Sequence, residues 1–268
     1  MELGFIGAGR MGRPMVERLV GEGHRVRVHV RTPEALEALA GVGAFPVASA
    51  GAAARDAEAV LVCLYDDEQV RAVCLEGELP AALSAGAVLV VHTTGSPRVV
   101  QALAARGVTV VDAPVSGGPH DVAAGRLTVF AGGERGALEC VRPALRAYAD
   151  PLVHVGPLGA GQCLKLVNNT LFAAQIGLLA EAVRFARDLG VPEETLLGAL
   201  PHASGASRAA LGAAVKGSVA ALAASAGPFL RKDLAVGAEV RAELGSARLG
   251  ALEPALWALL LLLDGTTA

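Results

Sequence analysis

The sequence predicts an α/β fold in which a doubly wound, mainly parallel sheet is followed by a second domain made only of helices. From the first residue to about residue 157, short β-rich runs alternate with helical stretches, which is typical of crossover units in a parallel sheet. After Gly156-Pro157 no further convincing strand occurs, and Ala, Leu and Gly dominate a run of helices. We therefore expect a sheet domain at residues 1–158 and an all-helical domain at residues 159–268.

The expected strands are short apolar runs bounded by helical or turn-forming residues. They lie at residues 3–6, 25–30, 44–47, 59–64, 88–91, 109–112, 127–131 and 152–155. Helices are expected between most of them, for example at residues 11–21 and 97–105. Strands and helices that alternate in this way predict a sheet covered on both faces.

The helical domain should open with one long helix from about residue 162 to residue 189, ended by Gly190 with Pro192 just beyond. At 1.5 Å per residue this helix would be about 42 Å long. Because it is apolar around most of its circumference, we expect it to pack on several neighbours, including another subunit. Later helices are expected at residues 192–200, 207–215, 229–244 and 248–263, while the Ala-rich stretch 219–226 suits a helix as well as a loop.

Composition and charge narrow the class of protein. The chain has 268 residues, 53% of them hydrophobic, and a net charge of −3, so it can bury a large core but lacks the basic surface that nucleic acids or anionic membranes require. We expect a small-molecule partner, no nucleic acid and no membrane. The first residues enter a strand pattern without a basic lead or a cleavage site, which favours a cytoplasmic protein. The four cysteines are scattered without metal-ligand spacing, so we expect free thiols and no metal site.

A glycine-rich turn follows the first expected strand and opens a helix: Gly7-Ala8-Gly9-Arg10-Met11-Gly12. The first glycine allows the tight turn, the second lets the backbone approach a pyrophosphate, and the third allows the helix to pack on the strand. The pyrophosphate would lie at the positive end of the helix dipole. The position after a strand and before a helix indicates a Rossmann-type dinucleotide-binding domain, with NAD or NADP as its cofactor.

The end of the second expected strand favours NADP over NAD. An NAD enzyme usually carries Asp or Glu at this place, about 20 residues after the glycine turn, for the ribose hydroxyls. Here the chain has Arg31 and Thr32, which suit a 2′-phosphate through charge-assisted hydrogen bonds. The alternative is that Arg31 is a solvated charge at the end of a strand.

A lysine and an asparagine mark the start of the long helix. Lys165 and Asn169 are four residues apart in an almost uncharged apolar stretch, so a helix places both side chains on one face. A buried ammonium is costly unless it is paired or its proton is used. The simpler interpretation is a lysine whose stem lies on apolar surface while its charge reaches solvent.

Taken together, four segments resemble the β-hydroxyacid dehydrogenase family, which includes 3-hydroxyisobutyrate dehydrogenases and tartronate semialdehyde or glyoxylate reductases. They are Gly7 to Gly12, Asp112-Ala-Pro-Val-Ser-Gly-Gly118, Gly159 to Asn169 and Lys232-Asp233-Leu234. The resemblance covers essentially the whole chain. It implies a Rossmann domain, a long interdomain helix and an all-helical domain, with the site in the cleft between the domains.

The resemblance also implies roles for individual residues. Ser116, Gly117 and Gly118 would hold the carboxylate of a small-molecule substrate, and successive N–H groups of a Gly-Gly turn can bind an anion. Lys165 would be the acid/base, and Asn169 would orient it and the substrate.

The remaining implied roles concern the cofactor. Lys232 would lie over its nicotinamide half with Asp233 nearby. Leu64 and Tyr65 would lie on its adenosine side, although the family usually has Leu-Pro there. Thr94 would meet the nicotinamide ribose or amide.

Two departures from the family pattern put the substrate in question. The family commonly has Gly where this chain has Asp121, and a small or aliphatic residue where it has His120, so the wall beside the carboxylate site should differ. We favour the interpretation of His120 as an ordinary loop histidine over that of a substrate contact. The segment after Lys232 is also shorter than usual, so we expect that a closing helix is either missing or supplied by a partner subunit.

The expected reaction is hydride transfer between nicotinamide and a short 3-hydroxyacid or semialdehyde. An imine reductase is the alternative enzyme, because that group shares the fold and the glycine turn. Its members generally lack a lysine at the position of Lys165, so the presence of Lys165 favours carbonyl chemistry. A dinucleotide-binding module without turnover is the other alternative, and it has no need of Lys165, Asn169 and Ser116 together. The apolar long helix predicts a homodimer or homotetramer formed through the helical domain.

Overall fold

The computed structural model describes residues 1–30, 32–246 and 248–264 of the chain. Its packing separates two units, residues 1–165 and residues 166–268, and each is described by itself. The predicted change of domain between residues 158 and 159 stays a prediction.

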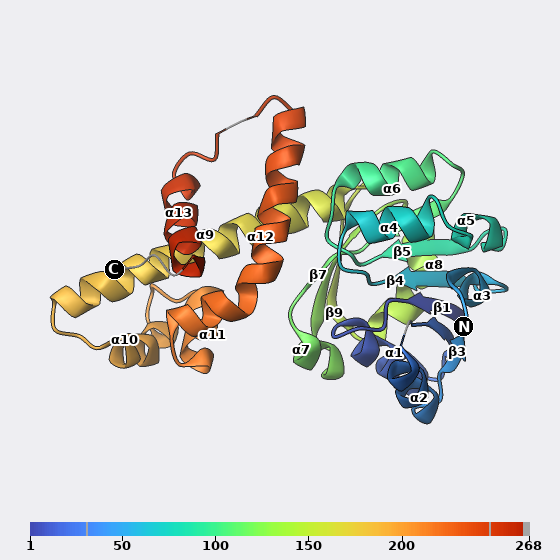
Figure 1. Cartoon of the computed structure of the whole chain (residues 1–268), viewed down its shortest axis with the longest axis horizontal. Coiled ribbons are helices and arrows are strands. Elements are labelled where there is room, and N and C mark those ends of the chain that lie inside the picture. The colour runs from blue at the N-terminus through green and yellow to red at the C-terminus, as the bar shows by residue number, and fades with distance from the viewer. Residues whose placement is uncertain (31, 247, 265–268) are drawn as a thin grey trace. The chain divides into compact units, whose positions relative to one another are not determined.

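Among the described residues of the first unit, nine strands form one sheet, shown in Figure 1. Its spatial order is β3-β2-β1-β4-β5-β6-β8-β7, and β9 pairs with β8. The six strands from β3 to β6 are parallel and follow the doubly wound order, which confirms the predicted fold class. The strands are β1 (Glu2–Ile6), β2 (Arg25–His29), β3 (Phe45–Val47), β4 (Ala59–Val62), β5 (Val88–Val91), β6 (Thr109–Asp112), β7 (Val115–Ser116), β8 (Leu127–Gly132) and β9 (Ala149–Gly156).

Helices cover both faces of this sheet because its central strands are apolar on both sides. All four residues of β4 are buried, and they alternate between two hydrophobic clusters. The first cluster includes residues from α1 (Gly12–Gly21), α2 (Pro33–Gly41), α7 (Pro119–Ala123) and α8 (Arg135–Arg146). The second includes residues from α3 (Ala50–Ala54), α4 (Asp67–Cys74), α5 (Leu79–Ala82) and α6 (Pro97–Ala104).

The eight expected strands are all present, two of them (residues 88–91 and 109–112) with the expected ends and the others with shifted ends, but β7 was not expected. This strand has only two residues and is held by antiparallel pairing of Val115 with Val129 and of Ser116 with Thr128. Its conformation therefore depends on a partner strand more than ten residues away in the chain, which a local pattern does not reveal.

The second unit is helical throughout its described residues. Its hydrophobic core is formed by the inner faces of the long helix α9 and of the later helices, which Figure 1 shows from yellow to red. The elements are α9 (Ala160–Asp188), which begins in the first unit, α10 (Glu193–Ala199), the 3-10 helix η1 (Leu200–His202), α11 (Arg208–Lys216), α12 (Val219–Glu243) and α13 (Leu252–Leu263).

Two helix starts differ from the sequence prediction by more than two residues. Helix α12 begins at Val219 rather than at residue 229, because the Ser218 side chain accepts the N–H of Ala221 and the Ala-rich segment packs Leu222 into the core. Helix α13 begins at Leu252 rather than at residue 248. Gly250 has a φ of +58°, which a right-handed helix does not allow.

Judged only by length and composition, helix α9 could cross a membrane. Among the described helices, the bent pair α11–α12 would also meet this criterion if the two helices formed one span. The core helix of a soluble protein meets the same criterion. The inner face of α9 belongs to the helical core, with Ala173, Ile176, Leu179 and Val183 buried in it.

Candidate functional site

The three glycines of the turn after β1 differ in what surrounds them. Gly7 has a φ of +91°, and a Cβ there would lie 2.4 Å from the Cys63 carbonyl oxygen. A Cβ at Gly12 would lie 2.3 Å from the Gly7 carbonyl oxygen. A Cβ at Gly9 would meet no protein atom within 4 Å. The fold itself therefore requires the first and third glycines, while the second borders open space.

The N-terminus of α1 fits a bound anion. Its first turn carries no acidic side chain, and no side chain caps it at Met11. Ala8 is buried, whereas Arg10 is exposed. Because free N–H groups and the helix dipole both favour negative charge, the open space beside Gly9 suits the pyrophosphate of a dinucleotide.

A surface hollow lies at the carboxyl ends of β2 and β3, where a doubly wound sheet binds the adenosine part of a dinucleotide. Its lining residues are His29, Val30, Leu36, Pro46, Val47 and Ala48. Thr32, predicted to contact the cofactor, is exposed and directly precedes α2. Arg31, the other predicted residue, lies outside the described residues.

The loops after β4 and β5 carry three further predicted cofactor residues and are joined to each other. The N–H of Leu64 donates to the Thr93 hydroxyl at 2.9 Å. Tyr65 is exposed and Thr94 is half-buried. Since β1, β4 and β5 are neighbours in the sheet, these loops lie at the same edge as the glycine turn.

The turn predicted to bind a substrate carboxylate contains a carboxylate of this chain. Ser116 is half-buried at the end of β7, and Gly117 has a φ of +133°. The N–H of Gly118 donates to Oδ2 of Asp121 at 2.8 Å. Asp121, which stands where the family commonly has Gly, lies at this turn through its contact with Gly118.

A buried carboxylate holds the first turn of α9. Asp112, at the end of β6, is fully buried, and its two oxygens accept the N–H groups of Gly159 at 2.7 Å and of Gln162 at 2.8 Å. A Cβ on Gly132 or Gly161 would lie within 3 Å of this carboxylate, so both glycines make room for it. Burial raises the pKa of Asp112, and the surrounding backbone N–H groups oppose that rise.

Gln162 links the same helical turn to the loop after β5. Its Nε2 donates to the Thr93 carbonyl at 2.8 Å, and its Oε1 accepts the Gly95 N–H at 2.9 Å. Lys165 follows Gln162 by one turn of α9 and is 8% exposed. The start of the helix that carries Lys165 is therefore tied to the loop that carries Thr94.

In the second unit, three of the predicted residues form one buried polar group. Asn169 is 7% exposed, and its Nδ2 donates to Oδ2 of Asp233 at 2.5 Å. The other oxygen of Asp233 lies 2.6 Å from Nζ of Lys232. Asn168 donates to the side-chain oxygen of Asn169 at 2.9 Å. These contacts fix the orientation of the Asn169 amide.

Asp112 and Gln162 were not predicted as functional residues from the sequence, although both lie in segments that carry the family resemblance. The available signal was a carboxylate at the end of an otherwise apolar strand, because a buried acid needs hydrogen-bond donors.

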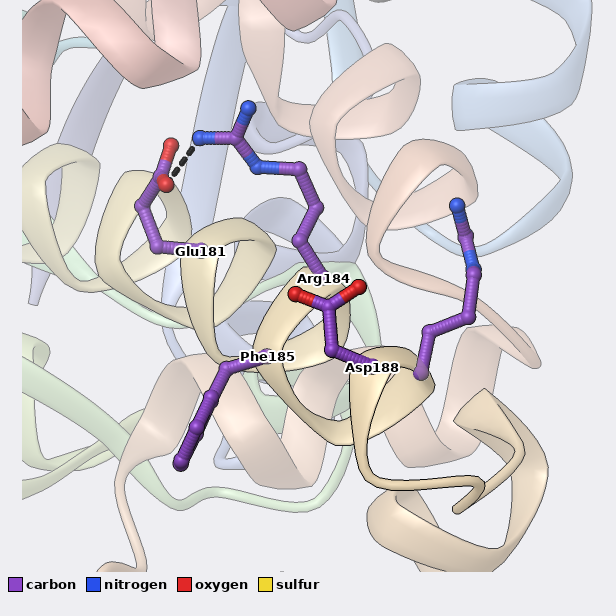
Figure 2. Close-up of a pocket in the computed structure, with 5 residues that line it drawn as sticks. Glu181, Arg184, Phe185 and Asp188 are labelled. Atoms are coloured by element: carbon purple, nitrogen blue, oxygen red, sulfur yellow. Dashed lines mark hydrogen bonds and ion pairs between the residues drawn. The ribbon is translucent and has the colours of Figure 1, made fainter.

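A second hollow lies on the last turns of α9. None of the predicted site residues lines it. Its lining residues are Glu181, Arg184, Phe185, Arg187 and Asp188. Figure 2 shows that they come from a single helix, with Glu181 paired to Arg184 and Phe185 projecting from the helix. Since Phe185 is 66% exposed, this is an open helix face rather than an enclosed site for a small molecule.

Within the described part of the chain, no group of three or more His, Cys, Asp or Glu side chains could hold a metal ion. The four cysteines are free thiols, as expected: Cys63 is half-buried, Cys74 is buried, and Cys140 and Cys163 are exposed. Burial raises the pKa of the Cys63 and Cys74 thiols to about 12.

Two family models together cover nearly the whole chain. The NAD binding domain of 6-phosphogluconate dehydrogenase matches residues 2–156. The NAD-binding domain of NADP-dependent 3-hydroxyisobutyrate dehydrogenase matches residues 159–263.

Individual relatives agree with these models. The probable 3-hydroxyisobutyrate dehydrogenase of Mycobacterium tuberculosis H37Rv is 37% identical over 206 residues, which are 76% of this chain and 70% of that protein. A solved 3-hydroxyisobutyrate dehydrogenase of Mycobacterium tuberculosis with L-serine has a TM-score of 0.83 at 29% identity, over 98% of this chain and 92% of that one. An imine reductase from Pseudomonas sp. has a TM-score of 0.69 at 20% identity, over 98% and 94% of the chains, and shares the fold. The chain belongs to the β-hydroxyacid dehydrogenase family and is a nicotinamide-dependent oxidoreductase acting on CH–OH groups.

Proposed function

We propose that this enzyme interconverts a short 3-hydroxyacid and its semialdehyde, with NADP as the preferred cofactor and Lys165 as the acid/base. Lys165 carries the proposal: it is 8% exposed at the start of an apolar helix whose first turn is held by Asp112 and Gln162. Asn169 lies one turn further along the same helix.

Most of the residues that would hold the cofactor belong to the first unit. The glycine turn with Ala8, Arg10 and Met11 would bind the pyrophosphate, and Arg31 and Thr32 would bind the 2′-phosphate. Leu64, Tyr65 and Thr94 follow the neighbouring strands β4 and β5. Lys232 and Asp233 would complete the nicotinamide side. When bound, the nicotinamide supplies the redox chemistry, which no side chain of this protein can perform.

The side chains of the protein would transfer one proton and orient the substrate. As the carbonyl becomes an alkoxide, the Lys165 ammonium stabilises the developing charge and donates a proton; in the other direction the neutral amine accepts it. Asn169 would position the substrate, since its amide is already oriented by Asp233. Ser116, Gly117 and Gly118 would bind the substrate carboxylate. The relatives named 3-hydroxyisobutyrate dehydrogenase support a short 3-hydroxyacid, with one carboxylate, as the substrate.

We also propose that the enzyme is a cytoplasmic homodimer or homotetramer formed through the helical unit. Helix α9 exposes apolar side chains at seven-residue intervals, namely Leu164, Leu171, Leu178 and Phe185. Such a stripe on one helix face is typical of a subunit interface.

The experiment that tests the acid/base assignment replaces Lys165 by Met, which keeps the apolar stem and removes the charge. NADPH oxidation is followed with a panel of small semialdehydes, 2-oxoacids and cyclic imines. We expect Lys165→Met to lower turnover by about 10²- to 10⁴-fold while NADPH affinity stays nearly unchanged. Lys216→Met, at the exposed end of α11, is the matched control and should retain full activity.

The outcome also separates the alternatives. Full activity of Lys165→Met on a semialdehyde would make the acid/base role wrong. Turnover of cyclic imines by both the parent and this variant would favour an imine reductase. NADPH binding without turnover of any member of the panel would favour a dinucleotide-binding module.

A further inference from the structure

The Asp121 carboxylate is seated on the turn that would bind the substrate carboxylate. Its Oδ2 accepts the Gly118 N–H at 2.8 Å. A Cβ on Gly117 would lie 2.8 Å from the same oxygen, which shows that the carboxylate also packs against Gly117. One of the N–H groups expected to bind a substrate anion is therefore already engaged by an internal anion.

No lysine or arginine among the described residues neutralises this carboxylate. The ion-pair partner of Asp121 is His120, whose Nε2 lies 3.2 Å from Oδ2. The His120 side chain is 80% exposed, whereas the Asp121 side chain is 25% exposed. Water therefore screens the imidazole more strongly than the carboxylate, and negative charge remains at the turn.

This charge changes which substrate the turn can accept. Two carboxylates close together repel each other, and the second one also loses the Gly118 N–H as a donor. A substrate that carries an ammonium group beside its carboxylate avoids this cost, because the ammonium can pair with Asp121 while the carboxylate uses the remaining groups of the turn.

We propose that Asp121 is a specificity-determining residue and that the enzyme selects 3-hydroxy-2-amino acids over 3-hydroxyacids without an amine. This inference rests on the proposed function, because it assumes that the substrate lies at Ser116, Gly117 and Gly118. It adds the chemical class of the substrate: a zwitterion with a hydroxyl group on the carbon next to the one that bears the ammonium.

Asp121 also has a structural role, because its Oδ2 accepts the N–H of Gly118, the N-cap residue of the short helix α7. Asp66 performs such a role for α4, where its Oδ1 accepts the Gln69 N–H at 2.9 Å. The two roles respond differently to loss of charge. Asp121→Asn keeps a side-chain oxygen that can accept the Gly118 N–H, so it preserves a cap and removes only the negative charge.

The test compares L-serine with 3-hydroxypropionate, which has the same hydroxyl and carboxylate but no amine. Dissociation constants are measured by calorimetry on the protein saturated with NADP, and kcat/KM is measured in the oxidation direction. We expect the parent to bind L-serine at least about tenfold more tightly, and Asp121→Asn to shift the ratio about 10- to 100-fold towards 3-hydroxypropionate. Asp121→Ser, whose hydroxyl can also cap the helix, should shift it the same way and serves if the asparagine variant does not fold.

Asp56→Asn is the matched control, because Asp56 is a 91% exposed carboxylate with a φ of +54°, a conformation that asparagine tolerates. It should leave the ratio unchanged. A parent that binds 3-hydroxypropionate as tightly as L-serine, or an Asp121→Asn ratio equal to that of the parent, would overturn the proposal. If L-serine binds more tightly than 3-hydroxypropionate, as expected, but neither compound is turned over, the proposed reaction would be wrong. The assignment of Asp121 as a specificity-determining residue would then still be supported.

Discussion

Gln162 donates its backbone N–H to Asp112 and uses its side chain to bind the loop after β5, so two buried polar residues join β6, β5 and the start of α9. Asp112 also accepts the N–H of Gly159. The first N–H groups of a helix have no partner within the helix, and here a carboxylate satisfies two of them. The position of Lys165 therefore depends on a contact between residues 50 positions apart.

The first prediction concerns the stability of this anchor. Asp112→Asn should lower the free energy of unfolding by about 2 to 4 kcal/mol, because the amide NH2 must face an N–H donor in a buried site and the charge at the helix start is lost. Urea denaturation measures the change. Asp66→Asn, at a partly exposed cap where one oxygen suffices, should cost less than about 1 kcal/mol. Equal losses in the two variants would contradict the anchoring role.

The second prediction separates cofactor binding from folding at the glycine turn. Gly9→Ala should weaken NADPH binding at least about tenfold, because the new methyl would occupy the space for the pyrophosphate. Its thermal stability should stay near that of the parent, since a Cβ there meets no protein atom within 4 Å. Gly12→Ala should instead lower stability, because its Cβ would lie 2.3 Å from the Gly7 carbonyl oxygen. Gly21→Ala, at the other end of α1, should change neither property.

Cofactor choice is the third prediction. NADPH should bind more tightly than NADH, and Arg31→Asp should narrow or reverse the preference because an acid repels the 2′-phosphate. Fluorescence titration with both cofactors measures the ratio. The control is Arg135→Asp, which makes the same charge reversal at an exposed position on α8 and should leave the ratio unchanged. Equal affinities for the two cofactors in the parent would show that Arg31 does not bind the 2′-phosphate of NADPH.

The fourth prediction concerns stability in acid and depends on the fully buried imidazole of His92. Its Nδ1 lies 2.7 Å from the Ala113 carbonyl oxygen and therefore carries the proton, so Nε2 accepts the Tyr148 hydroxyl at 2.8 Å. Burial lowers the pKa of His92 from 6.5 to about 4. Between these values the unfolded chain binds a proton that the folded protein does not, so stability falls as the pH falls.

The loss attributable to His92 should approach about 3 kcal/mol at pH 4, from about 1.4 kcal/mol for each unit of pKa. Urea denaturation between pH 7 and pH 4.5 is compared for the parent and His92→Gln. The variant should be less stable at pH 7 but lose less stability on acidification. Parallel pH profiles for the two proteins would show that His92 titrates normally in the folded state.

Assembly is the fifth prediction. If the exposed apolar face of α9 is a subunit interface, light scattering at micromolar concentration should give at least the mass of a dimer. Leu178→Lys, at a side chain that is 58% exposed, should weaken assembly without loss of the monomer fold, because a charge at the centre of an apolar interface is costly. Leu244→Lys, at a 76% exposed side chain at the end of α12, is the control. A monomeric parent would make the expectation wrong.

Much of the first unit was predictable because its signals are local. Runs such as Val88–Val91 are apolar at every position, which indicates a strand buried on both faces, and the turn from Gly7 to Gly12 stands between a strand and a helix. The pair Lys165 and Asn169 was visible because four residues make about one helical turn. The cofactor class and the proposed acid/base followed from patterns shorter than about 20 residues, and the fold class followed from the succession of such local patterns along the chain.

The features that the sequence did not predict depend on residues that are distant in the chain and meet only in the folded protein. The sequence could not show that β7 pairs with β8, that Asn169 donates to Asp233, or that Gln162 binds both Asp112 and the loop after β5. It marked Asp121 as unusual, but only the folded turn shows that this carboxylate engages the Gly118 N–H. Periodicity and glycine spacing report the local conformation of the backbone, whereas a buried hydrogen bond between distant residues exists only when the rest of the chain brings both groups out of water.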